Sequence, residues 1–107
     1  MPSDSKMLTV SIRQGEKVEL TRDEEFFAEL TVHGVTRDSV DMDIEADDLV
    51  EIMRPDGGVA HDFQSVKLDR SGVLTIQEGF DKALISYARR SLRINAPSTI
   101  TINRNSE

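Results

Sequence analysis

Apolar and polar residues alternate along much of this chain, a pattern that is typical of strands with one buried face. The clearest case is residues 40–47, in which Val, Met, Ile and Ala alternate with Asp41, Asp43, Glu45 and Asp47. Successive side chains of a strand point to opposite faces, so the apolar set faces a core and the acids face solvent. The same pattern, or a run of strand-forming residues, predicts further strands at 8–13, 18–20, 26–32, 49–53, 66–68, 73–76, 92–94 and 100–102.

Turn-forming sequences separate these segments. Pro55-Asp56-Gly57-Gly58 ends one strand, and Ser71-Gly72 predicts a hairpin that joins 66–68 to 73–76. Residues 80–90 fit both a helical stripe and a strand. Their position between predicted strands favours the strand, so we expect an all-β protein.

Composition narrows the class of protein further. A chain of 107 residues, 37% of them apolar, is too small to form two independent cores. There is no Trp and only one Tyr, so we expect a mainly aliphatic core, and the absence of Cys excludes disulfides and thiolate metal sites. The sequence has neither a signal-peptide pattern nor an apolar run of about 20 residues. We therefore expect a cytoplasmic protein without a membrane partner.

The candidate chemistry argues against an enzyme, and we predict neither a cofactor nor a metal. Alternating acids on one strand stand about 7 Å apart and lack a loop that wraps an ion. His33 and His61 have no neighbours at ligand spacing, and the sequence has no nucleophile elbow and no phosphate-cradling glycine loop. The net charge of −7 argues against indiscriminate nucleic-acid binding, although the second half of the chain is basic.

An internal repeat organises the chain. Residues 44–54 align without gaps on residues 94–104, and Ile, Ala, Ile and Arg coincide at identical spacing. A period of 50 residues in so short a chain indicates two copies of one unit. We place the first unit at 7–54, a linker at 55–64 and the second unit at 65–107, all within one folding unit.

The repeated unit resembles the carbon storage regulator (CsrA/RsmA) family of bacterial RNA-binding proteins. Met7–Glu16 stands where the family unit opens with Met-Leu-Ile-Leu-Thr-Arg-Arg-x-Gly-Glu, and Val32-His33-Gly34-Val35 resembles its Val-Leu-Gly-Val. Arg90–Pro97 is similar to its Val-Arg-Ile-Gly-Ile-Asn-Ala-Pro, and its last strand, which ends in a key Arg, resembles 49–54 and 99–104. The resemblance implies about ten strands, in two five-stranded units that interleave as a covalent pseudo-dimer without the family's C-terminal helix.

The resemblance also implies two RNA-binding edges, each formed by the first strand of one unit and the last strand of the other. In the family these edges bind hairpin loops that carry a Gly-Gly-Ala triplet, and an Arg fork with free strand backbone suits an unpaired base. This sequence departs from the family at Ile12, which replaces the first Arg of the Arg-Arg pair, and in its acidic strand at 40–47. Carried over, one edge holds Leu8, Val10, Arg13, Ile102 and Arg104, and the other holds Val66, Leu68, Arg70, Ile52 and Arg54.

A basic cluster of Arg89, Arg90 and Arg93 has two interpretations, a phosphate-binding patch and a solvated turn.

The leading functional hypothesis is a bacterial post-transcriptional regulator that binds Gly-Gly-Ala-type RNA loops and controls translation. An alternative is a protein-interaction module that kept the scaffold and lost RNA binding. A third reading is an unrelated all-β domain, which a fold without interleaved halves would support. Exposed sheet edges also allow further self-association.

Overall fold

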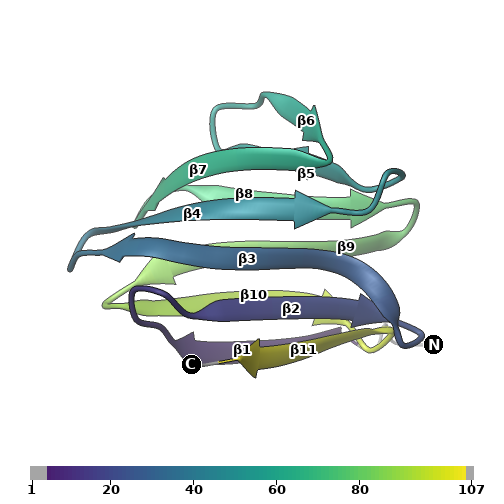
Figure 1. The fold of residues 1–107 in the computed structure, drawn as a ribbon, viewed down its shortest axis with the longest axis horizontal. Helices are drawn as coiled ribbons and strands as arrows, with labels where there is room; N and C mark the ends of the chain where they lie inside the picture. Colours follow the sequence, from purple (N-terminus) through teal and green to yellow (C-terminus); the bar gives the residue numbers. More distant parts are fainter. Residues whose placement is uncertain (1–4, 106–107) are drawn as a thin grey trace.

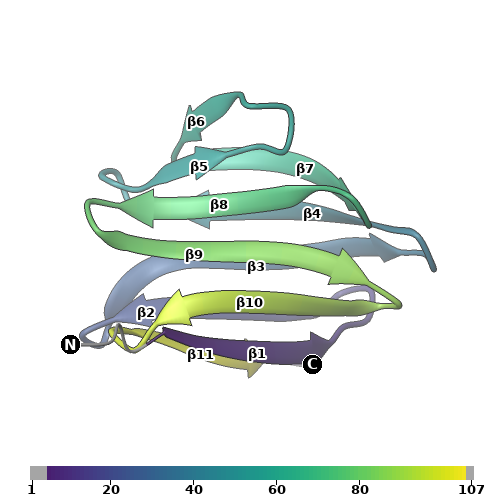
Figure 2. The ribbon, with the colours of Figure 1, turned by 180° about the vertical axis from the view of Figure 1, so that it is seen from behind.

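The computed structural model describes residues 5–105, and within that range it contains eleven strands and no helix. The all-β prediction is confirmed. The strands form two antiparallel sheets that pack face to face, with the five-stranded sheet in front in Figure 1 and the six-stranded sheet in front in Figure 2. No helix in the described range is long and apolar enough to cross a membrane.

In spatial order, the five-stranded sheet consists of β11 (Ile100–Asn105), β2 (Lys17–Arg22), β3 (Glu25–Val35), β4 (Ser39–Ala46) and β7 (Phe63–Asp69). The six-stranded sheet consists of β1 (Ser5–Ser11), β10 (Ser91–Pro97), β9 (Asp81–Ala88), β8 (Val73–Glu78), β5 (Glu51–Met53) and β6 (Val59–His61).

The two repeats exchange their outer strands. β2, β3 and β4 of the first repeat are flanked by β11 and β7 of the second, and β10, β9 and β8 of the second repeat are flanked by β1 and β5 of the first. Every sheet therefore needs both halves of the chain, as the predicted interleaved arrangement requires. The strand beyond the expected ten is β6, which extends the sheet next to β5.

The core lies between the sheets and is mainly aliphatic, with Phe27 and Tyr87 as its aromatic members. No polar or charged residue is buried among those that the structure describes. Repeat-equivalent positions are buried in both halves, for example Ile44 and Ile94, each 0% exposed. Full burial of such a side chain stabilises the fold by about 1.5–3 kcal/mol. The alternating apolar residues therefore explain why the strands of both repeats turn the same face toward the core.

Residues 80–90 form a strand rather than a helix. β9 covers Asp81–Ala88, and Ala83, Ile85 and Tyr87 all point into the core. Arg89 and Arg90 form the turn to β10, both in the left-handed region with φ of 52° and 63°.

One local prediction is wrong. Residues 66–68 and 73–76 do not form a hairpin, because β7 pairs with β4 in one sheet while β8 pairs with β5 and β9 in the other. The turn between them takes the chain from one sheet to the other. A turn sequence predicts that the chain changes direction, but it does not specify which strands pair. The predicted linker, residues 55–64, contains β6 and the start of β7 at Phe63.

Candidate nucleic-acid interface

One side of the sandwich brings together the first strand of one repeat and the last strand of the other. β1 ends the six-stranded sheet and β11 ends the five-stranded sheet, and neither has a strand on its outer side. Arg104 on β11 donates a hydrogen bond from Nη1 to the Ser11 carbonyl oxygen of β1, at 3.0 Å. These two strands, called the open edge below, are the pair that the sequence resemblance selects.

The apolar residues expected at the open edge differ in accessibility. Leu8 is 40% exposed, whereas Val10 is 6% exposed and belongs to the core. Ile102 is partly buried and packs against the same core. Leu8 is therefore the apolar side chain of this set that a ligand can contact readily.

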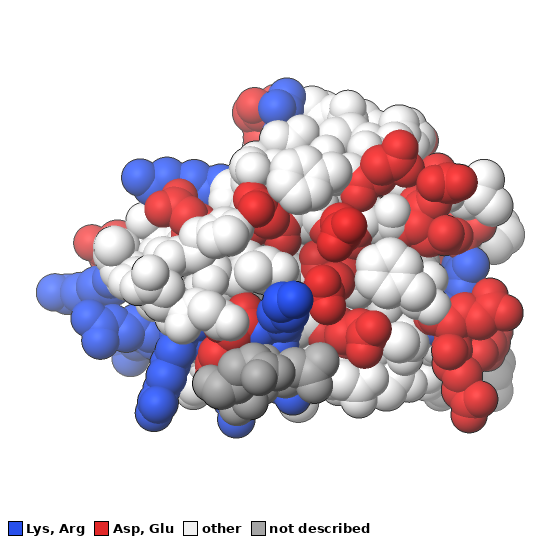
Figure 3. All heavy atoms as spheres, in the orientation of Figure 1, with Lys and Arg blue, Asp and Glu red and all other residues white. Residues whose placement is uncertain are grey.

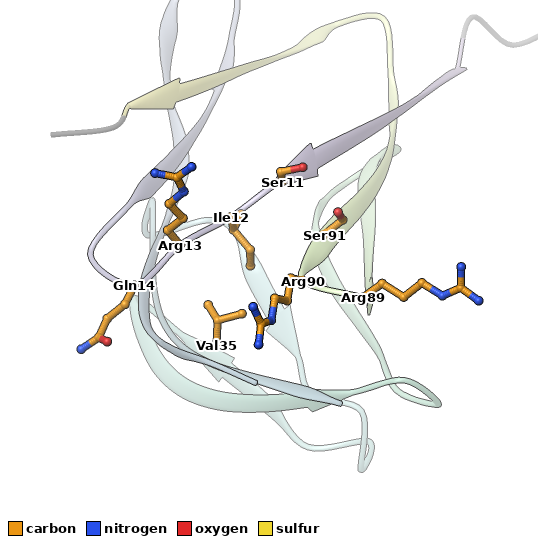
Figure 4. Close-up of a pocket in the computed structure, with 8 residues that line it drawn as sticks. All are labelled: Ser11, Ile12, Arg13, Gln14, Val35, Arg89, Arg90 and Ser91. Atoms are coloured by element: carbon orange, nitrogen blue, oxygen red, sulfur yellow. The ribbon is translucent and has the colours of Figure 1, made fainter. Parts of the chain in front are cut away.

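A cleft of about 410 Å³ continues from the end of β1. Arg13 lies on one side of it and the Arg89-Arg90 turn on the other, and the two sides are joined by the hydrogen bond from Ile12 N to Arg90 O, at 3.1 Å. Figure 4 shows Arg90 turned toward Val35, Arg89 extending away from the other labelled side chains, and Arg13 directed away from Val35. The cleft is lined by Ser11, Ile12, Arg13, Gln14, Val35, Arg89, Arg90 and Ser91.

The arginines of the cleft are available to an anion. Within residues 5–105, no carboxylate forms an ion pair with Arg13, Arg89 or Arg90. The Arg13 backbone is fixed separately, because its N–H donates to Glu16 Oε1 at 2.9 Å. Sequence reasoning missed this convergence, since residues 13 and 89–90 meet only after the repeats exchange strands.

Arg93 does not share the cleft with its predicted companions. It lies on β10, opposite Thr9 of β1, and lines a separate shallow pocket with Met7 and Leu84. Arg89 and Arg90 belong to the preceding turn, so the basic cluster is divided between the end of the sandwich and the outer face of the six-stranded sheet.

The second expected edge, formed by β5 and β7, is built differently. β5 lies between β8 and β6, so both of its edges are paired. Ile52 is 0% exposed, and Val66 and Leu68 also belong to the core. Arg54 Nε lies 3.3 Å from Asp56 Oδ1, within the turn that leads to β6.

The register of the outer strands also distinguishes the two edges. β1 pairs with β10 and β7 pairs with β4, and the 50-residue period relates β10 to β4. Aligning the strands by these partners places Val66 at the position of Val10, and it places Asp69, not Arg70, at the position of Arg13. An acid therefore occupies the place of an arginine of the open edge.

The acids of β4 face solvent on the five-stranded sheet, as predicted, and their neighbours extend the acidic surface. Glu29 of β3 lies directly opposite both Glu19 of β2 and Glu45 of β4. Figure 3 shows the resulting acidic band across this sheet, with Lys and Arg gathered at the end on the left, where β3 joins β4. The three-glutamate row depends on strand register, which the sequence pattern does not reveal.

Hydrogen bonds tie one acid of this face to its neighbours. Asp43 Oδ1 accepts from Ser65 Oγ at 2.6 Å, and Asp43 Oδ2 lies 2.6 Å from His33 Nε2. The hydroxyl and then the imidazole hold the pKa of Asp43 below its usual value. Among residues 5–105, no group of three or more His, Asp and Glu is arranged to hold a metal ion.

Comparison with known proteins adds no assignment, because no family model, no curated protein and no solved structure matches this chain.

Proposed function

We propose that this protein binds single-stranded RNA at the open edge, as a post-transcriptional regulator that recognises a Gly-Gly-Ala-type hairpin loop. The observation that carries the proposal is that β1 of the first repeat and β11 of the second end their sheets on the same side of the sandwich, with Arg104 reaching from one strand to the other. The choice of the Gly-Gly-Ala triplet rests on the sequence resemblance to the carbon storage regulator family.

The open edge offers the two kinds of contact that loop recognition needs. Free backbone along β1 and β11 can pair with the edges of unstacked bases, and Leu8 offers an apolar surface beside them. Arg104 and Arg13 offer guanidinium groups to phosphates or to guanine. The Arg89-Arg90 turn supplies further positive charge for the backbone that leaves the loop.

The test is a fluorescence-anisotropy titration with a labelled Gly-Gly-Ala hairpin and a scrambled-loop control, each at two salt concentrations. Selective binding is expected, and each single-strand phosphate contact lowers the slope of log K against log salt by about 0.7, so two to four contacts give a slope of roughly −1.5 to −3. Equal binding of both RNAs that disappears as salt rises would refute loop recognition.

A matched pair of variants locates the binding. Arg104→Ala is expected to weaken binding by roughly 5- to 150-fold, the effect of about 1–3 kcal/mol that a good Arg contact contributes. Lys82→Ala removes the same charge from an exposed position on β9 and is expected to leave the affinity within about twofold. Equal losses would mean that only net charge matters.

The acidic row of Glu19, Glu29 and Glu45 favours a second candidate function, a docking module for a basic protein partner. Charge reversal at Glu29 distinguishes the two functions. The RNA proposal expects the affinity for the hairpin to stay within a few fold, whereas a docking module would lose its partner while binding no RNA.

A further inference from the structure

The chain itself covers the β5 side of the second edge, whereas β7, the other strand of that edge, ends its sheet. Residues 59–61 form β6, which pairs with β5 in the register Glu51↔His61, Ile52↔Ala60 and Met53↔Val59. The opposite side of β5 pairs with β8. At the open edge, by contrast, β11 pairs only with β2, so its outer backbone groups are free. An unstacked base can therefore form hydrogen bonds with the backbone of β11, whereas the backbone of β5 is already paired on both sides.

The arginine of the second edge is held by the turn that leads into β6. Arg54 N donates to Gly58 O at 2.8 Å, and Gly57 N donates to Arg54 O at 2.9 Å. Its side chain lies over Gly58, where an added Cβ would stand 2.0 Å from Nη2, and Asp56 faces its Nε. The guanidinium is thus packed on its own turn, whereas its repeat equivalent Arg104 spans two strands.

At the second edge Lys67 of β7 and Arg54 line one pocket, but an acid stands where the open edge has an arginine. Asp69 occupies the position that Arg13 holds at the open edge. The next residue, Arg70, extends from Nη1 toward Asp38 Oδ1 at 3.6 Å. An acid at this position repels the phosphate that an arginine would attract.

We propose that β6 permanently occupies the β5 side of the second edge, and that the protein binds one RNA loop per chain, at the open edge alone. The stoichiometry rests on the proposed function, whereas the occupation of the edge does not. A chain with one usable edge cannot join two loops of the same transcript, which a protein with two equivalent edges can do.

Isothermal titration calorimetry of the full chain with a short Gly-Gly-Ala hairpin tests the stoichiometry, and repeat-equivalent variants test the edge. One RNA per chain is expected, with Arg54→Ala within about twofold of the unaltered protein and Arg104→Ala weakened at least about fivefold. Circular dichroism checks that both variants are folded. Two RNAs per chain, or equal losses in the two variants, would overturn the proposal.

Residue-resolved hydrogen exchange on the free protein separates this inference from the proposed function. Amides of β5 that point toward β6 are expected to exchange much more slowly than outward-facing amides of β11, because only the former are hydrogen-bonded to a neighbouring strand. If the chain bound no RNA, the proposed function would fail while slow β5 exchange still supported the occupied edge. Exchange at β5 as fast as at outward β11 positions would overturn it whatever the RNA result.

Discussion

The difference between the two edges predicts unequal costs for the same substitution at repeat-equivalent positions. Ile52 of β5 is 0% exposed and has a strand on each side, whereas Ile102 of β11 is only partly buried. Replacing a fully buried Ile by Ala typically lowers the free energy of unfolding by 2–5 kcal/mol, because both apolar burial and packing are lost, so we expect about 3 kcal/mol for Ile52→Ala. A partly exposed Ile forms fewer contacts, and we expect about 1 kcal/mol for Ile102→Ala.

Urea unfolding followed by far-UV circular dichroism measures both costs. With a slope of about 1.5 kcal/mol per M for a domain of this size, the midpoint should fall by about 2 M for Ile52→Ala and by under 1 M for Ile102→Ala. If the dependence of the unfolding free energy on urea is the same for both variants, the difference between their midpoints reports a difference in stability alone. Equal midpoints, or a larger fall for Ile102→Ala, would refute the view that β6 and β8 enclose β5 while β11 stays at an open edge.

Three further predictions concern charge and proton binding. Glu29→Gln removes repulsion from two directly opposite glutamates and should raise the free energy of unfolding by about 0.2–1 kcal/mol. Thermal unfolding measures the increase, which should disappear at high salt because salt screens the repulsion. Asp43 has a lowered pKa in the folded protein, so its contribution to stability is present above the unfolded pKa of about 3.9 and is lost as the pH falls through the folded value; Asp43→Asn should therefore flatten the stability profile below about pH 4, and an unchanged profile would contradict this. Burial raises the pKa of Tyr87, whose hydroxyl donates to the Thr36 carbonyl. The contribution of Tyr87 to stability is therefore fully present below the unfolded pKa of about 10, and it is lost as the pH rises through the folded value. Tyr87→Phe should cost about 1 kcal/mol at neutral pH and remove that alkaline fall, and urea unfolding across the alkaline range checks both.

The sequence pattern predicted the strands well because burial on one face imposes a period of two. Alternation at 40–47 identified the inward residues of β4. Residues 80–90 also fit a helical stripe, and their position between predicted strands, rather than their pattern, favoured the strand that β9 forms. The strand exchange was not visible in alternation, since a strand buries the same face whichever neighbour it pairs with. That expectation came from the repeat and the resemblance it supports.

The parts of the site that escaped prediction depend on contacts between distant segments. β6 has only three residues and lies next to the turn sequence at 55–58, so no periodicity marks it. Pairing register alone places Asp69 at the position of Arg13. The meeting of Arg13 with the Arg89-Arg90 turn likewise requires the exchanged strands to be in place.

RNA binding at the open edge is tested most directly by an NMR titration of isotope-labelled protein with the Gly-Gly-Ala hairpin, read as shifts of assigned backbone amides. Binding at the open edge predicts shifts concentrated in β1, β11 and the cleft residues 11–14 and 89–91, with β5, β6 and β7 unchanged. Shifts centred on β5 to β7 or on the acidic face of the five-stranded sheet, or no selective shifts at all, would contradict the account.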